Sequence, residues 1–119
     1  MPNTLGNGEW LEVGQSLWSQ NGETELKMQE DGKIAVYVKG ECVFQNTNQE
    51  RYDVKGIHMQ SDGNLVMYDN NNNPLWSTNS TGSADPSSVI CAVQNDGNVV
   101  LYTGQALWAT NTGRVPWPQ

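Results

Sequence analysis

The sequence predicts an all-β domain made of three small sheets around a pseudo-threefold axis. One ten-residue motif occurs three times, with a period of about 32 residues. Each copy places Asp-Gly between alternating apolar residues, the strongest short-range signal for a β-hairpin. No segment repeats apolar residues with the period of a helix. The 119 residues are enough for one domain with a modest core, which we expect to span residues 1–119.

The repeated motif occupies residues 28–37, 59–68 and 93–102, and the copies align without gaps. In the second copy, MQSDGNLVMY, Leu65 and Met67 alternate with less apolar or smaller residues. Because successive side chains of a strand point to opposite faces, we expect Leu65 and Met67 to face the core. The equivalent pairs are Ile34 with Val36 and Val99 with Leu101.

A second element follows each motif and carries one aromatic residue. These residues are Phe44 in CVFQNTN, Trp76 in PLWSTNS and Trp108 in ALWATNT, and SLWSQNG around Trp18 reads as a further copy before the first motif. Because they recur away from the polar residues of the motif, a shared core on the pseudo-threefold axis explains them better than a second binding surface. Trp10 and Trp117 stand outside the repeats, and Trp117 lies between two prolines in an extended tail.

Charge and composition exclude several classes of partner. The net charge is −7 at pH 7, and no basic stripe is present that would bind the phosphates of a nucleic acid. The same charge disfavours an anionic membrane surface, and no stretch approaches the roughly 18 apolar residues of a membrane helix. The N-terminus has neither the basic start nor the apolar run of a signal peptide. We therefore expect neutral partners, with no nucleic acid and no membrane insertion.

The outward face of the second hairpin has the chemistry of a carbohydrate site. Folding at Asp-Gly brings Gln60 and Asp62 beside Asn64, Val66 and Tyr68. Amides donate and accept hydrogen bonds, carboxylates accept and tyrosine does either, which suits the vicinal hydroxyls of a hexose. Valine adds a small contact for the C–H surface of the sugar. Turn chemistry alone explains only the Asp and the Gly, whereas the whole set recurs in the third copy as Gln94, Asp96, Asn98, Val100 and Tyr102.

The pattern Gln-x-Asp-x-Asn-x-Val-x-Tyr resembles the signature of the bulb-type (snowdrop-like) mannose-binding lectins, and the elements PLWSTNSTG and ALWATNTG resemble theirs. The similarity covers roughly residues 11–113. It implies the fold named β-prism II, with three four-stranded antiparallel sheets, one mannose pocket per complete motif, and no metal or other cofactor. It also implies that Asp and Asn hold the axial 2-hydroxyl of mannose, Gln the 3-hydroxyl and Tyr the 4-hydroxyl, while Val packs on the ring. These roles fall on Gln60, Asp62, Asn64, Val66 and Tyr68, and on Gln94, Asp96, Asn98, Val100 and Tyr102.

The first copy departs from this pattern. Gln29, Asp31 and Tyr37 are present, but Lys33 replaces the Asn and Ala35 replaces the Val. Lysine has three donors and no acceptor, and its ammonium can pair with Asp31. We therefore expect the first site to be inactive or altered, and its three conserved residues are doubtful ligands.

The two cysteines, Cys42 and Cys91, leave two alternatives: a bridge, if the fold brings them together, or two separate buried thiols. Two cysteines with one histidine do not make a zinc site. In many plant members of the family, a disulfide joins the first Asp-x turn to the start of the second unit. The corresponding positions in this chain are Gly32 and residues 53–57, and none of them is a cysteine. The absent bridge favours a cytosolic protein, with secretion as the alternative.

Three further features of the sequence do not indicate a metal site or a catalytic site. Residues 69–74 superficially suggest a calcium loop but lack its alternating acidic ligands, so we expect a polar hairpin loop. Asn79-Ser80-Thr81 is a glycosylation acceptor only in a secreted chain. The repeated aspartates belong to different units, too far apart for a glycosidase pair, and a single histidine offers no triad, so we expect no enzyme activity.

Two functional hypotheses remain from the sequence. The first is a lectin for α-mannose and high-mannose glycans, and the family resemblance also implies a homodimer formed by exchange of the C-terminal strand, residues 106–111. The alternative is a β-prism protein–protein interaction module with vestigial sugar sites. The two intact motifs count against the alternative, because such a module has no need to keep the five residues together twice.

Overall fold

The computed structural model describes residues 2–83, 85–103 and 106–113, and in this part of the chain the structure is β apart from one short 3-10 turn. The strands are β1 (Thr4–Leu5), β2 (Trp10–Glu12), β3 (Ser16–Trp18), β4 (Thr24–Met28), β5 (Ile34–Val38), β6 (Glu41–Gln45), β7 (Val54–Met59), β8 (Leu65–Asp69), β9 (Pro74–Ser77), β10 (Ile90–Val93), β11 (Val99–Tyr102) and β12 (Ala106–Ala109), and the 3-10 turn is η1 (Pro86–Ser88). These described residues contain no helix with the length and apolarity needed to span a bilayer.

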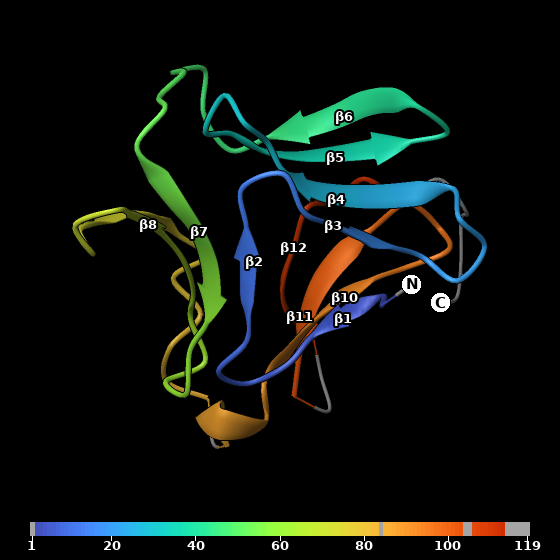
Figure 1. Cartoon of the computed structure of the whole chain (residues 1–119). Helices are drawn as coiled ribbons and strands as arrows, with labels where there is room; N and C mark the ends of the chain where they lie inside the picture. The colour runs from blue at the N-terminus through green and yellow to red at the C-terminus, as the bar shows by residue number, and fades with distance from the viewer. Residues whose placement is uncertain (1, 84, 104–105, 114–119) are drawn as a thin grey trace.

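The strands form three antiparallel sheets of four strands each, which confirms the predicted fold class. Their orders are β1-β10-β11-β12 (sheet A), β2-β7-β8-β9 (sheet B) and β3-β4-β5-β6 (sheet C). Figure 1 shows the three sheets arranged around a common centre. Each repeated motif is the hairpin between the two middle strands of one sheet: β4–β5, β7–β8 and β10–β11.

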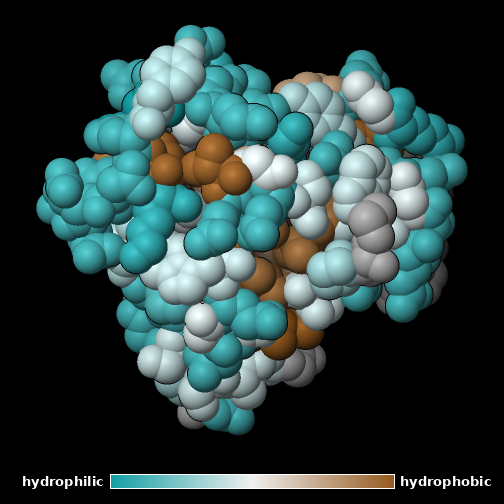
Figure 2. All heavy atoms as spheres, in the orientation of Figure 1, coloured by the Kyte–Doolittle hydropathy of each residue, from teal (hydrophilic) through white to brown (hydrophobic). Residues whose placement is uncertain are grey.

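The N-terminal segment supplies the first edge strand of every sheet. Its strands β1, β2 and β3 bury Leu5, Leu11 and Leu17, each at most 4% exposed, against the common core. Between these strands lies a groove of about 360 Å³, and Figure 2 shows apolar atoms near the centre of an otherwise hydrophilic face.

The interpretation of SLWSQNG as another copy of the aromatic element is wrong. Trp18 lies on β3, which pairs with β4 at the edge opposite β6, and its neighbour Leu17 fills the inward position.

The inward faces of the hairpins are as the alternation predicted. Leu65 and Met67 are buried, and so are their counterparts on β5 and β11. The aromatic rings of the opposite edge strands meet at the centre, since Trp108 makes edge-on contacts with Trp76 at 5.8 Å and with Phe44 at 6.1 Å. The shared aromatic core is therefore confirmed for three of the four predicted residues, and Trp18 is the exception. Trp117 lies outside the described residues.

The first Asp-Gly turn is joined to the second unit without a covalent bridge. Gly32 has φ +85°, and a Cβ there would lie 2.3 Å from the backbone oxygen of Arg51, so only glycine fits. The Arg51 N–H donates to the backbone oxygen of Asp31 at 2.9 Å. This contact joins the first turn to the segment that leads into β7.

Both cysteines are free thiols on different sheets, so they form no bridge. Cys91 is buried on β10, as expected, and burial raises the pKa of its thiol to about 12. The expectation that Cys42 is also buried is wrong, because it lies exposed on the edge strand β6.

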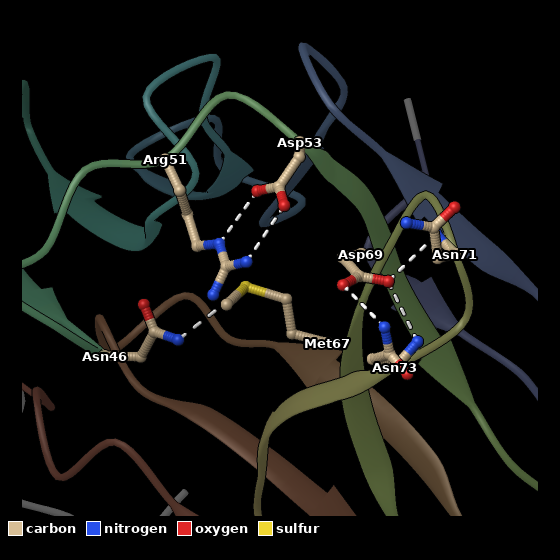
Figure 3. Close-up of polar contacts among 7 residues, drawn as sticks. All are labelled: Asn46, Arg51, Asp53, Met67, Asp69, Asn71 and Asn73. Carbon is tan, nitrogen blue, oxygen red and sulfur yellow. Dashed lines mark hydrogen bonds and ion pairs between the residues drawn. The ribbon is translucent and has the colours of Figure 1, made fainter.

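The asparagine-rich loop between β8 and β9 is a closed hairpin loop. The Asp69 carboxylate accepts hydrogen bonds from the N–H groups of Asn71 and Asn73, both at 2.9 Å, and from the Asn73 side chain at 3.1 Å (Figure 3). Its oxygens therefore organise the loop itself. Nearby, Arg51 donates two hydrogen bonds to Asp53, at 2.8 and 2.9 Å.

Candidate functional site

The two complete motifs have the same backbone frame. In the second copy Gln60 and Asn64 face each other across the turn, where the Gln60 N–H donates to the Asn64 carbonyl at 3.0 Å. Gln94 and Asn98 repeat this bond at 2.9 Å in the third copy. The structure thus brings together each predicted set of five residues at the tip and on the outward face of its hairpin.

The aspartate of each motif keeps one oxygen for the turn. Oδ1 of Asp62 accepts the N–H of Asn64, and Oδ1 of Asp96 accepts that of Asn98, both at 3.0 Å. The second carboxylate oxygen is left as a strong acceptor. The two sites differ in access: Asp62 is exposed, while Asp96 is 5% exposed and its Oδ2 lies against Gly113.

The asparagine of each motif is clamped by the aromatic element that follows. Oδ1 of Asn64 accepts from the Thr78 hydroxyl at 3.1 Å and from the Ser80 N–H at 3.3 Å. In the third copy Asn98 receives the same two bonds, at 3.1 and 3.3 Å, from Thr110 and Thr112. Since the carbonyl oxygen is occupied, the Nδ2 group remains as an oriented donor on the outward face.

Sequence reasoning missed these clamp residues. Thr78 also accepts the buried N–H of Leu65 at 3.2 Å, and the Ser80 hydroxyl donates to the carbonyl of Gly63 at 2.7 Å. Asn79 between them has φ +53°, and Asn111 in the third copy has φ +59°. Both residues are in the left-handed region, which asparagine tolerates better than most residues. The repeated Thr-Asn-Ser/Thr was the available signal, but the sequence suggested only a core tryptophan beside it and, at residues 79–81, a glycosylation acceptor.

Glutamine and tyrosine form the third part of each site. Nε2 of Gln60 donates to the Tyr68 hydroxyl, and Gln94 does the same to Tyr102. The tyrosine hydrogen is then free to be donated outward. Oε1 of Gln94 is buried and has no hydrogen-bond partner in the structure, so its acceptor capacity is unused. Val66 is 4% exposed and forms the floor of the second patch rather than a broad apolar surface.

The first copy is closed on itself. Gln29 donates to Asp31 Oδ1 at 3.0 Å and accepts from the Tyr37 hydroxyl, so both ends of its amide are used. The suggested pairing of Lys33 with Asp31 is wrong, because the described residues show no such ion pair and Asp31 instead accepts the Lys33 backbone N–H at 3.1 Å. Asn46 occupies the clamp position and accepts the Ile34 N–H at 2.8 Å. This copy therefore lacks both the asparagine and its clamp.

Comparison with known proteins identifies the family. No protein-family model matches the chain. The mannose-specific lectin of Aloe arborescens is 33% identical over 113 residues, which cover 94% of this chain and 99% of that protein. The chain belongs to the bulb-type mannose-binding lectin family.

Solved structures of lectins share the fold of this family member over almost its whole length. The Marasmius oreades lectin superposes with a TM-score of 0.85 at 30% identity, covering 97% of this chain and 95% of that one. The snowdrop (Galanthus nivalis) agglutinin, solved with methyl α-D-mannoside, gives 0.73 at 33% identity, with 92% and 96% covered. A domain-swapped lectin dimer from Mycobacterium smegmatis gives 0.54 at 34% identity, with 90% and 97% covered.

Proposed function

We propose that the chain is a mannose-binding lectin with two working sites, one on the β7–β8 hairpin and one on the β10–β11 hairpin, and that it catalyses no reaction. The observation that carries this proposal is the clamped asparagine, which occurs in both complete motifs with equivalent partners and the same distances. A protein that did not use the outward amide would have no need to hold it twice.

The free groups of each site match the hydroxyls of mannose. Asp62 Oδ2 accepts and Asn64 Nδ2 donates, so together they satisfy one hydroxyl, which is both donor and acceptor. We assign them to the axial 2-hydroxyl, Gln60 to the 3-hydroxyl and Tyr68 to the 4-hydroxyl, with Val66 under the ring. The third motif repeats these assignments with Gln94, Asp96, Asn98, Val100 and Tyr102. A sugar of different configuration leaves a polar group unmatched, at a cost of roughly 1–3 kcal/mol.

The test is calorimetric titration with methyl α-mannoside, with methyl α-galactoside as the comparison sugar. The unsubstituted chain should bind about two mannosides and no galactoside. Asp62→Ala and Asp96→Ala should each remove one site, and the double variant should remove both. Asp31→Ala is the matched control and should leave both sites intact.

The titration also separates this proposal from the protein-interaction alternative. Absence of heat with methyl α-mannoside and with mannose oligosaccharides, at concentrations that saturate weak lectin sites, would contradict the proposed function. Binding of an unglycosylated protein that free mannose does not displace would then favour an interaction module.

We further propose a homodimer that exchanges β12 between chains. In the structure β12 completes its own sheet as an edge strand, and its pairing with β11 shifts register between Leu101 and Tyr102. The swapped Mycobacterium dimer supports an exchange within this fold. Two chains would present four sites to one glycan-coated surface and so gain avidity. Light scattering on the purified chain distinguishes a dimer from a monomer.

A further inference from the structure

An aromatic wall stands beside the second motif. On the outward face of sheet B, Trp10 pairs with His58, and His58 pairs with Val66, the floor of the proposed mannose site. The indole of Trp10 stacks on the His58 imidazole with ring centroids 4.3 Å apart and planes within 8°. It also lies 5.8 Å from the Tyr68 ring, at 50°. The wall therefore continues from a residue of the site to the edge strand β2.

The other two motifs lack this wall. The residues equivalent to Trp10 and His58 are Thr4 and Ala92 beside the third motif, and Ser16 and Lys27 beside the first. The two complete motifs have the same five residues and equivalent clamps. The aromatic wall therefore distinguishes the surroundings of the second motif from those of the third.

Trp10 is placed about one sugar ring beyond the mannose position. Neighbouring strands are roughly 4.8 Å apart, so Trp10 lies about two spacings, or ~10 Å, from Val66. Between Tyr68 and β2 stands Gly56, which pairs with Tyr68 on one side and with Glu12 on the other, so that β2 approaches the backbone of β7 closely at this point. A Cβ at Gly56 would lie 2.5 Å from the Leu11 carbonyl oxygen.

The indole stacks on His58, and an exposed lysine also contacts the ring. Lys55 Nζ lies 4.5 Å from the centroid of the Trp10 ring and 3.4 Å from Asn72 Oδ1. Lys55 is exposed and forms no ion pair with another described residue. An exposed cation–π contact of this kind is weak, so the lysine can yield the face of the ring to a ligand.

We propose that Trp10, His58 and Tyr68 form a second subsite, which stacks a neutral hexose linked to the mannose at the second motif. The C–H face of a pyranose is apolar enough to pack on an indole, which offers a large flat surface. Glu12, which pairs with Gly56 beside Tyr68, and the net charge of −7 both favour an uncharged sugar over an acidic one. The second motif is thus a disaccharide site, and the third is a monosaccharide site. This inference rests on the proposed function.

The test compares methyl α-mannoside with the α-linked mannobioses on chains that keep one site each. Asp96→Ala leaves the second motif, and Asp62→Ala leaves the third. At least one mannobiose should bind the Asp96→Ala chain about tenfold more tightly than methyl α-mannoside. The Asp62→Ala chain should show no such gain. Adding Trp10→Thr, the residue of sheet A at this position, or His58→Ala should remove the gain and leave methyl α-mannoside binding unchanged.

A second measurement tests the contact with Trp10 directly and uses the unsubstituted chain. In the unsubstituted chain, the indole N–H resonance of Trp10, assigned by its loss in Trp10→Phe, should shift further with the mannobiose than with methyl α-mannoside. Equal gains at both motifs, a gain that survives Trp10→Thr, or an indole signal indifferent to the second sugar would overturn the subsite and leave the proposed function standing. Failure of both sugars to bind either chain would overturn both.

Discussion

The side-chain oxygen Oδ1 of Asn64 lies 3.1 Å from the Thr78 hydroxyl, and Asn98 and Thr110 repeat this distance on another sheet. Each threonine also accepts the first N–H of the returning strand. Thr78 accepts it from Leu65 at 3.2 Å, and Thr110 accepts it from Val99 at 3.1 Å. One hydroxyl therefore connects the orientation of an outward-facing amide to the closure of its hairpin.

Replacing Thr78 with valine should weaken both functions of this hydroxyl. Loss of the bond to Asn64 should lower mannoside affinity at the second site about five- to tenfold, measured by titration of the Asp96→Ala chain. The unsatisfied N–H of Leu65 should cost about 1–3 kcal/mol in urea unfolding. Ser77→Ala is the control, because the Ser77 hydroxyl bonds Asn79 instead. Unchanged affinity would show that the clamp does not orient Asn64.

The first copy, which we expect to be inactive, should gain mannoside binding only together with its clamp. Lys33→Asn with Ala35→Val restores the motif, yet Asn46 still occupies the threonine position and Thr47 is not left-handed like Asn79. We expect this pair to bind two mannosides per chain, like the unsubstituted protein. Adding Asn46→Thr, Thr47→Asn and Asn48→Ser should raise the number to three. Three sites with the pair alone would mean that the motif suffices without the clamp.

The hairpins and the two five-residue patches on their outward faces were predictable because they depend on local patterns. Asp-Gly fixes the turn, and alternation assigns Leu65 and Met67 to the core. The N-terminal edge strands were not recognised, because β1, β2 and β3 are only two or three residues long, and β1 and β2 pair with the distant strands β10 and β7. Trp18 was misplaced for a related reason: SLWS and PLWS look alike, although they form opposite edges of their sheets. Cys42 resembled a core residue, but its strand is an edge whose outward positions face solvent.

Asp69 should stabilise the β8–β9 loop in a pH-dependent way. Its pKa is lowered, chiefly by the hydrogen bond from the backbone N–H of Asn73 and next by the bond from the Asn73 side chain. The N–H of Asn71 lowers the pKa further, while burial opposes these effects without cancelling them. A carboxyl with a lowered folded pKa contributes stability above its ordinary value of 3.8, and this contribution is lost as pH falls through the folded value. Asp69→Ala should therefore lower the melting temperature by several degrees at neutral pH, with the difference closing in strong acid. Glu41→Ala, at an exposed edge, should show no such pattern; a difference that persists in acid would contradict the electrostatic origin.

The two thiols should differ sharply in reactivity. Cys42 is exposed, whereas Cys91 is buried with a pKa raised to about 12, so its reactive thiolate is scarce in the folded chain. Mass spectrometry after treatment with iodoacetamide should find one adduct on the folded protein and two on the urea-unfolded protein. Cys42→Ser should reduce the folded count to zero. Rapid modification of Cys91 in the folded variant would indicate that sheet A opens readily.

The edge strands donated by the first eighteen residues also set the order in which the molecule can be assembled. During synthesis β3 finds β4 almost at once, β2 waits for β7, and β1 stays unpaired until β10 has been made. Such long-range pairing carries a large loop-closure cost and slows folding. The first strand of the fold is thus among the last to be secured, and the prism cannot close before β10 has been made.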